Sequence, residues 1–373
     1  MHNKLSINNF KCFSQKTDIE LGKISVCLGS NSVGKSSVLQ SCILIRQIYE
    51  KANKSKINKD DKVIVELNDV YGLQLGDSEH IKSSTNLEDI HLEIDDVEFV
   101  LNSLANTPLE MEVLMPQSIE RLREKEGLFS EGFYYLNAER LGPRNYQIID
   151  GKAVNNCGVH GENTIHFYNK VSNNKVDEKR CYKLDDNKKV SAVSKQVEYW
   201  MDYIIPGINI KADDLMDLRL SKLLFSQTTL DTGFLSPYSF GFGISYVLPI
   251  IVTGLVAEEG SVILVENPEA HLHPKGQSHI GYFLAMMSFA GVQVIVETHS
   301  EHVLNGIRIA TLKEKKSSND VVFNFFSISN DGGKNANRVE RIILNERMDI
   351  ENWPEGFMDQ EEQDLKLLRE LRR

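Results

Sequence analysis

The sequence of 373 residues has few of the features that mark secreted, membrane or zinc-binding proteins. Its five cysteines are scattered and form no Cys-x-x-Cys pair, which favours reduced thiols in a cytosol over a disulfide framework or a zinc site. It contains no run of 18 apolar residues, and residues 246–256, the longest apolar stretch, are too short to span a bilayer. The N-terminus shows no apolar signal-peptide core. We therefore expect a cytoplasmic protein without a membrane partner.

Basic charge, internal repeats and sustained heptads are lacking as well. The net charge is −11, whereas proteins that coat DNA without sequence preference are usually basic. Because heptads are absent, we expect no long coiled-coil arm. The lysine-rich residues 51–62 predict a solvated loop. What is present is a composition with 41% hydrophobic residues, which is enough for a sizeable core.

Short apolar segments alternate with longer amphipathic ones along the chain. Residues 5–10 alternate in polarity and predict an edge strand, and residues 24–28 predict a buried strand followed by a helix from residue 36 to about residue 50. Further strands are expected at residues 17–21, 63–67, 91–94, 132–136, 261–265 and 292–296, and helices at residues 118–126, 194–204, 244–256, 275–289 and 301–312. This order predicts an α/β fold with a mixed, largely parallel sheet flanked by helices.

A glycine-rich loop joins the strand at residues 24–28 to the helix that follows. Its sequence, Gly-Ser-Asn-Ser-Val-Gly-Lys-Ser, fits the Gly-x-x-x-x-Gly-Lys-Ser pattern, in which backbone N–H groups surround phosphates, the lysine reaches the β- and γ-phosphates and the serine ligates Mg²⁺. The helix adds its positive N-terminal end. The residues expected to bind nucleotide here are Gly29, Asn31, Gly34, Lys35, Ser36 and Ser37.

Three further segments contain candidate residues of a nucleotide site, and the glycine loop strengthens that interpretation of each of them. An apolar strand that ends in Glu266 is the arrangement with which P-loop ATPases hold Mg²⁺, although alone it also fits an ordinary strand before a turn. His299 follows the apolar residues 292–296 and could contact a γ-phosphate, or be structural. Residues 240–245 fit either an anion site at a helix start or a simple N-cap. His271 and His273 lack further metal ligands, so we expect a loop role.

These elements, in this order, resemble the head of ABC-type ATPases, in the branch that contains the SMC, RecF and OLD-type ATPases. The matching segments are residues 5–13, 266–274 and 297–300, which resemble the N-terminal strand, the Walker B motif with its D-loop, and the switch-histidine segment. A narrower resemblance joins the chain to bacterial stand-alone AAA-family ATPases with a short C-terminal domain of unknown function. It covers residues 135–144, 158–163, 241–249 and 353–360.

The resemblance implies a head-to-tail homodimer, or a higher homo-oligomer, that uses ATP and Mg²⁺. Each ATP would lie between the glycine loop of one protomer and Gly241, Gly243 and Ser245 of the other. Ser36 and Glu266 would hold Mg²⁺, and His299 would sense the γ-phosphate. Gln74 could be the Q-loop residue, although an exposed loop glutamine explains it as well.

The resemblance also implies a division of the chain. We expect one ATPase lobe with the glycine loop at residues 1–100 and an inserted lobe of helices and strands at residues 101–238. A second ATPase lobe would occupy residues 239–330, and a small C-terminal domain residues 331–373.

The sequence departs from many ABC ATPases directly after Glu266. Those ATPases carry a glutamate at the next position, where it polarises the attacking water, and here the residue is Asn267, which cannot accept a proton as a carboxylate does. Either Glu269 or His299 takes over, or hydrolysis is slow. The candidate catalytic residues are thus Glu266, Glu269 and His299, and we expect slow turnover.

Two functions remain open at this stage. The first is the ATPase sensor subunit of an anti-phage system, gating a separate effector such as the HNH nuclease of Septu-like systems, because no Asp-x-Asp nuclease cluster follows His299. The second is a RecF/SMC-like ATPase that binds DNA directly. A transporter subunit is disfavoured because the Leu-Ser-Gly-Gly-Gln signature is absent. A small-molecule kinase is disfavoured because it would not need His299 or the segment after Gly241.

Overall fold

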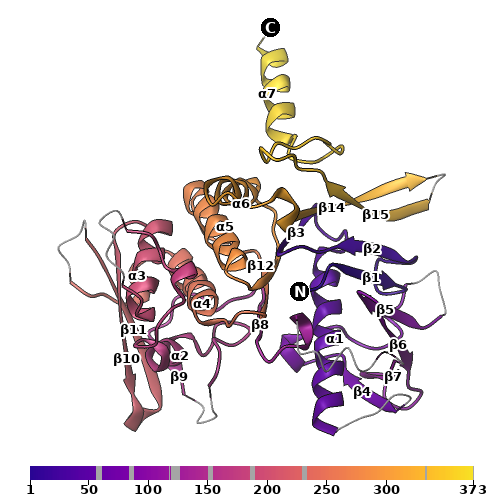
Figure 1. Ribbon diagram of the computed structural model, residues 1–373, viewed down its shortest axis with the longest axis horizontal. Helices are drawn as coiled ribbons and strands as arrows, with labels where there is room; N and C mark the ends of the chain where they lie inside the picture. The colour runs from indigo at the N-terminus through magenta and orange to yellow at the C-terminus, as the bar shows by residue number, and fades with distance from the viewer. Residues whose placement is uncertain are drawn as a thin grey trace. The chain divides into compact units, whose positions relative to one another are not determined.

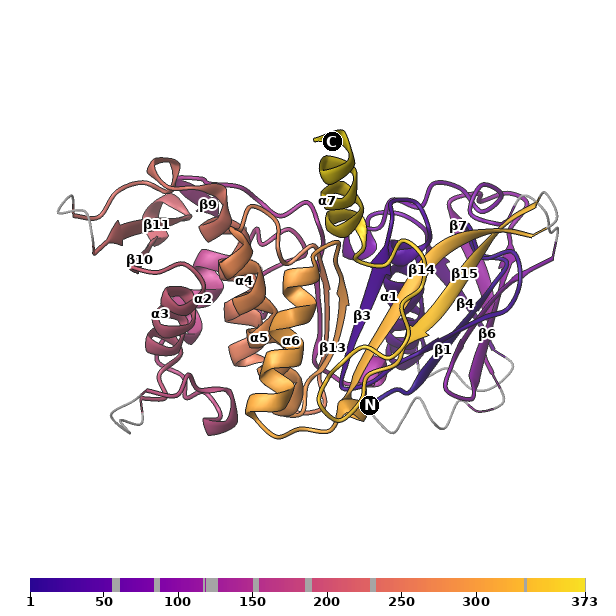
Figure 2. The ribbon, with the colours of Figure 1, turned by 90° about the horizontal axis from the view of Figure 1, so that it is seen from above.

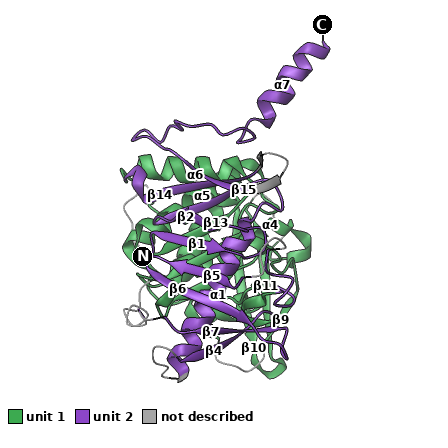
Figure 3. Cartoon of the chain, turned by 90° about the vertical axis from the view of Figure 1, so that its right-hand side faces the viewer, with its two compact units in different colours: residues 1, 69–73, 122–316 green, residues 2–68, 74–121, 317–373 purple. Residues whose placement is uncertain are grey.

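The computed structural model describes residues 1–55, 61–83, 88–116, 118, 127–149, 154–184, 190–228, 233–331 and 334–372. They form two compact units, each made of separate stretches of chain (Figure 3). Unit 1 contains residues 1, 69–73 and 122–316, and unit 2 contains residues 2–68, 74–121 and 317–373. The four-part division expected from the sequence follows the chain rather than the packing, and it stays a prediction.

Unit 2 contains an antiparallel sheet with the strand order β2-β1-β5-β6-β7-β4. The strands are β1 (Lys4–Asn8), β2 (Thr17–Glu20), β4 (Lys62–Glu66), β5 (Ile90–Ile94), β6 (Val97–Ser103) and β7 (Glu110–Leu114). The sequence predicted β1 as an edge strand, and this is wrong, since β1 pairs with β2 on one side and with β5 on the other. Its alternation reflects one face packed on the core, with Leu5 and Ile7 fully buried.

The remainder of unit 2 carries the glycine loop. Strand β3 (Ile24–Gly29) runs parallel to β14 (Val321–Asp331), which pairs with β15 (Lys334–Ile342) in an antiparallel hairpin. Helix α1 (Lys35–Ser55) follows the loop and ends five residues beyond the expected end, because its buried face continues through Ile48, Tyr49 and Ala52. Residues 51–55 are therefore helical rather than loop. Helix α7 (Gln360–Leu371) closes the described chain.

Unit 1 contains a parallel group of strands covered by helices. Strand β12 (Val262–Glu266) pairs in parallel with β8 (Phe133–Leu136) and with β13 (Gln293–Glu297). Helices α4 (Phe242–Val256), α5 (Pro274–Phe289) and α6 (Glu301–Lys313) lie beside these strands (Figure 2). All five residues of β13 are buried, as expected of a strand in a parallel sheet.

A smaller lobe belongs to unit 1 as well. It consists of α2 (Thr164–Val171), α3 (Val193–Ile204) and a three-stranded sheet in which β11 (Leu220–Gln227) lies between β10 (Ile208–Leu215) and β9 (Tyr146–Ile148) (Figure 1). The fold is thus mixed α/β, with a largely parallel sheet flanked by helices and an inserted helical and β lobe, as the sequence predicted, and with the antiparallel sheet of unit 2 in addition.

Two predicted features concern helices. The helix expected at residues 118–126 lies outside the described residues except for residue 118. Over the described ranges, α1 is the longest helix with 21 residues, so no long coiled coil is present in them. None of the described helices is long and apolar enough to cross a membrane.

Candidate functional site

The glycine loop at the end of β3 needs glycine at two positions. Gly29 and Gly34 have φ angles of 137° and 105°, which the backbone of a residue with a side chain rarely adopts. A Cβ atom on Gly29 would lie 2.1 Å from the carbonyl oxygen of Phe326, and one on Gly34 would lie 2.6 Å from Cys12 Sγ. The backbone therefore turns tightly here and packs against neighbouring segments of unit 2.

Lys35 and the serines after it occupy the first turn of α1, at the positive end of the helix. Lys35 is only 3% exposed, and its Nζ donates to the carbonyl oxygens of Gly29 (3.0 Å) and Ser30, so the ammonium lies within the loop. Ser36 is half-buried and Asn31 is exposed. This geometry presents the ammonium where phosphates bind in such loops.

Ser37 is buried below the loop rather than exposed at its mouth. Its hydroxyl hydrogen-bonds to the thiol of Cys12, while burial is the main cause that raises the pKa of that thiol. Ser37 therefore contacts the support of the loop, and its role in nucleotide binding stays a prediction.

Gln74 lies in a short loop of unit 2, opposite Asn68 in an isolated antiparallel bridge. Its side chain is exposed, while the Asn68 side chain donates to the carbonyl oxygen of Gly76 (2.9 Å) and accepts from its N–H group (3.0 Å). The structure shows how Asn68 shapes the loop, and the Q-loop role of Gln74 stays a prediction.

In unit 1, the carboxylate of Glu266 is fixed by two donors at the end of β12. Its Oε1 accepts from the Tyr135 hydroxyl (2.8 Å), and its Oε2 accepts from the backbone N–H group of Ala138 (3.3 Å). Tyr135 is buried on the neighbouring strand β8, and burial, together with the negative charge of Glu266, raises its pKa. The hydroxyl thus stays protonated and orients the carboxylate.

Arg140 holds the chain around Glu266 in place. The guanidinium donates to the main-chain oxygens of Asn137 (2.7 Å), Glu266 (2.6 Å) and Asn267 (2.7 Å), and through Nε to that of Tyr246 (3.1 Å) in α4. The side chain is 2% exposed, and burial lowers its pKa to about 10. Arg140 therefore ties the end of β12 to the helix that begins with the Gly241 segment.

A turn with the sequence Gly-Val-His-Gly-Glu-Asn supports the segment that carries Arg140. The N–H groups of Asn137 and Leu141 donate to the main-chain oxygens of Val159 (3.1 Å) and His160 (2.8 Å). The Glu162 carboxylate folds back and accepts from the N–H group of His160 (2.8 Å). Two segments that carried the narrow sequence resemblance therefore meet here, and together they position Arg140.

Asn267, Glu269 and His299 lie together beyond the strand ends. Asn267 has a φ of 43°, and its N–H group donates to the main-chain oxygen of Glu297 (2.8 Å), while Glu269 Oε1 accepts from the His299 N–H group (2.9 Å). The His299 side chain is exposed. The structure thus brings Glu269 and His299 into contact through the backbone of the histidine.

Buried acceptor atoms near Glu266 fit a hydrated cation. Asn137 Oδ1, Asn267 Oδ1 and Glu269 Oε2 are buried, and none of the three has a hydrogen-bond partner. Each can accept from water ligands, and Mg²⁺ usually keeps several waters and takes one or two carboxylates. The described residues contain no group of three or more histidine, cysteine or acidic side chains that could hold a metal ion by themselves.

The segment expected to meet the nucleotide of a second protomer begins α4. Gly241 is the exposed N-cap, and a Cβ atom there would meet nothing within 4 Å, whereas one on Gly243 would lie 2.7 Å from the carbonyl oxygen of His271. Ser245 is half-buried. The helix begins at Phe242, two residues earlier than predicted, so the segment forms its first turn. His273 caps α5, in keeping with a loop role.

Tyr135 and Arg140 are the residues that sequence reasoning missed. Both lie in the segment 135–144, whose resemblance to one family was recognised without a role for either side chain. The only signal was the position of this segment directly after a predicted strand. Their contacts with Glu266 depend on the pairing of β8 with β12, which joins residues 129 positions apart in sequence and which no local pattern indicates.

Comparison with known families shows two matches, which together cover most of the chain. Residues 24–305 match the family described as "AAA domain, putative AbiEii toxin, Type IV TA system", and residues 317–368 match "Protein of unknown function (DUF3696)". None of the curated proteins matches the chain.

Solved structures of SMC heads are similar to it. The SmcHead bound to the C-winged helix domain of ScpA is 12% identical with a TM-score of 0.51, over 93% of this chain and 99% of that one. The SMC head domain from Thermotoga maritima is 10% identical, with a TM-score of 0.43 over 92% of this chain and 99% of that one. The Smc head with an extended coiled coil, derived from Pyrococcus furiosus, is 11% identical, with a TM-score of 0.48 over 100% and 99%.

The family match covers more than half of the chain, and the likeness to the first of these structures confirms the ABC-type head fold. Such ATPases use a nucleotide and typically Mg²⁺, in agreement with the glycine loop and with the fixed carboxylate of Glu266. The chain therefore belongs to the AAA-domain family of ATPases and has the fold of an SMC-type head.

Proposed function

We propose that this protein is an ATP-dependent switch that gates a separate effector of an anti-phage defence system. In this proposal the glycine loop binds the phosphates of ATP, Lys35 neutralises their charge, and Ser36 and Glu266 hold Mg²⁺. Bound Mg²⁺ supplies charge neutralisation at the phosphates. His299 senses the γ-phosphate, and the segment from Gly241 to Ser245 of a second protomer completes the site in a head-to-tail homodimer.

One observation carries the preference for a switch over a fast motor. Asn267 follows the oriented carboxylate of Glu266, and an amide does not act as a general base. One oxygen of Glu269 already accepts from the His299 backbone, which holds this carboxylate beside the γ-phosphate sensor. Slow hydrolysis keeps the ATP-bound state populated for long enough to control a partner.

Steady-state hydrolysis of ATP by the purified protein tests the switch. We expect slow turnover that Glu269→Gln, which retains an acceptor for the His299 N–H group, leaves close to the wild-type rate. A rate typical of fast ABC motors that is abolished in both Glu269→Ala and Glu269→Gln would instead identify Glu269 as the general base.

The role in defence has its own test. The support for a separate effector is the match to the family described as "AAA domain, putative AbiEii toxin, Type IV TA system", together with the absence of an Asp-x-Asp nuclease cluster after His299 in the sequence. We expect the protein to co-purify from its native host with an effector such as an HNH nuclease, in an ATP-dependent manner. Tight binding to DNA alone with a steep salt dependence would favour the RecF/SMC-like function instead.

A further inference from the structure

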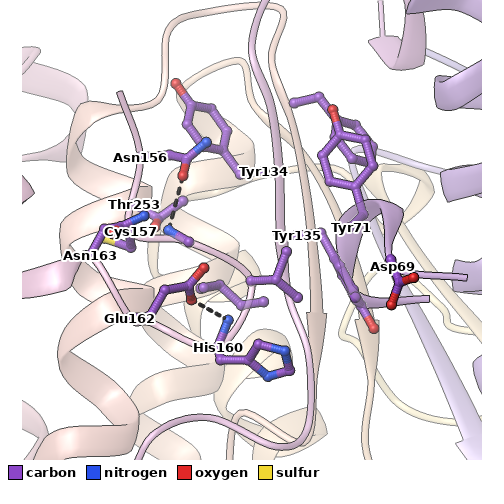
Figure 4. Close-up of a pocket in the computed structure, with 15 residues that line it drawn as sticks. Asp69, Tyr71, Tyr134, Tyr135, Asn156, Cys157, His160, Glu162, Asn163 and Thr253 are labelled. Carbon is purple, nitrogen blue, oxygen red and sulfur yellow. Dashed lines mark hydrogen bonds between the residues drawn. The ribbon is translucent and has the colours of Figure 1, made fainter. Parts of the chain in front are cut away.

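A cavity of about 380 Å³ lies within unit 1, beside β8 and next to the residues that orient Glu266 (Figure 4). Four aromatic residues, Tyr71, Phe133, Tyr134 and Tyr135, belong to its lining. The turn at residues 156–163 contributes polar groups, and none of the functions proposed above uses this space. Its size is in the range of small-molecule sites.

The charge of the wall selects a class of ligand. Asp69 and Glu162 line the cavity, and among the described residues that line it there is neither a lysine nor an arginine. Figure 4 draws Glu162 and His160 on one side of the view and Asp69 and Tyr71 on the other. Among the described lining residues, two carboxylates would repel a phosphate or a carboxylate, and the arginine charges that act on Tyr134 and Tyr135 come from outside the lining, so anions, the phosphates of ATP included, are disfavoured.

The arrangement of the rings narrows the class further. Tyr71 and Phe133 meet edge to face, with centroids 5.2 Å apart and planes at 75°, so these two rings do not form a parallel slot for a flat base. Aromatic residues and carboxylates in one lining are the surroundings in which an organic cation is stabilised, through the negative face of a π-system and through opposite charge. An ammonium or guanidinium group satisfies both the rings and the carboxylates.

We propose that this cavity binds a small organic cation, an ammonium or guanidinium compound, and that Tyr135 transmits its binding to Glu266. Tyr135 lines the cavity, while its hydroxyl donates to Glu266 Oε1 at 2.8 Å. A cation against the ring withdraws electron density from the phenol, which makes the hydroxyl a stronger hydrogen-bond donor to Glu266. In the opposite direction, a stronger hydrogen bond to Glu266 raises the electron density of the ring and so its attraction for the cation. The coupling to Mg²⁺ and ATP rests on the proposed function, whereas the binding of the cation does not.

Calorimetric titration of the nucleotide-free, full-length protein tests the site itself. Choline and spermidine serve as probes at matched ionic strength, with guanosine as an uncharged ring compound for comparison. We expect saturable binding of at least one cation and weaker binding of guanosine. The absence of saturable heat for both cations up to about 10 mM, or a preference for guanosine, would overturn the proposal.

Matched variants assign the binding to the cavity. Asp69→Asn suits the local φ of 70°, and Glu162→Gln keeps an acceptor for the His160 N–H group, so both remove charge with little change of shape. Each should weaken the binding of the cation about fivefold. Asp217→Asn removes an exposed charge elsewhere in unit 1 and should stay within about twofold of wild type. Equal effects of all three would overturn the assignment.

The rings and the coupling are tested separately. Tyr71→Phe should retain the affinity for choline, and Tyr71→Leu should lower it about tenfold.

In the wild type, Mg²⁺ with ATP should change the affinity for choline at least about threefold. Linkage requires that choline change the affinity for ATP by the same factor. Tyr135→Phe should bind choline without this change. If ATP binds and choline affinity does not respond, the coupling is refuted. If the wild type does not bind ATP, the proposed function fails. The binding of choline to the nucleotide-free protein still tests whether the cavity takes an organic cation.

Discussion

Replacement of Arg140 by methionine is the sharpest test of the architecture around Glu266. The substitution keeps an unbranched side chain of similar length but removes the donors to four main-chain oxygens, at 2.6 to 3.1 Å. It also removes the guanidinium that lies 5.3 Å from the ring centroid of Tyr246. Each of these oxygens loses a donor in a site where Arg140 itself is 2% exposed.

The magnitude follows from these contacts. A hydrogen bond from a charged donor contributes about 1.5–3 kcal/mol, but four bonds from one group are not additive, and the desolvation of the guanidinium offsets part of the gain. We therefore expect Arg140→Met to lower the free energy of unfolding of unit 1 by about 3–5 kcal/mol. Arg140→Lys should cost about 2 kcal/mol, because a single ammonium cannot replace the planar fork.

The assay uses the two tryptophans of the chain. Trp200 is buried in unit 1, whereas Trp353 is exposed in unit 2, so a Trp353→Phe background gives urea unfolding of unit 1 by fluorescence. A loss of 4 kcal/mol moves the midpoint down by about 1.5 M urea. Arg144→Met, which removes an exposed arginine of unit 1, should cost only about 0.5 kcal/mol. Equal midpoints for Arg140→Met and Arg144→Met would refute the reasoning.

Two further predictions concern pH and the glycine loop. The ring of His279 stacks on Tyr203, with centroids 3.8 Å apart, and burial lowers the pKa of the imidazole. As pH falls below about 6.5, His279 therefore takes up a proton in the unfolded chain before it does so in the folded chain. The urea midpoint of unit 1 should therefore fall below that pH, and the fall should be smaller in His279→Gln. Gly34→Ala combines backbone strain with a clash against Cys12, and it should lower the free energy of unfolding by about 2–4 kcal/mol, measured by thermal unfolding. Gly76→Ala creates backbone strain without a clash, because no atom lies within 4 Å of the added Cβ, and it should cost about 1 kcal/mol. Equal costs would contradict the clash.

Local sequence patterns were enough for most of the elements that position the site. The buried strand before Gly29, the strand before Glu266 and the helices after both follow from runs of apolar residues and from caps, which act over short distances. The place of β1 in its sheet was predicted wrongly, because alternation shows which face is buried and not how many neighbours a strand has.

The supports of the candidate site could not be predicted in the same way. The roles of Tyr135 and Arg140 arise from contacts across more than 120 positions of sequence, and the orphaned acceptors of Asn137, Asn267 and Glu269 are properties of packing. A pattern within a window of ten or twenty residues carries no information about such contacts. The residues of the glycine loop, by contrast, act next to one another, so their spacing alone indicated phosphate binding.

ATP-dependent dimerisation is the central claim, and sedimentation velocity of the purified protein tests it most directly. With Mg²⁺ and ATP we expect the wild type to shift from the mass of one chain to that of two, because the slow turnover that we propose would keep ATP bound. Lys35→Ala, which removes the ammonium from the glycine loop, should stay a monomer under the same conditions. A Lys35→Ala protein that fails to bind nucleotide but still dimerises on addition of ATP would contradict the account.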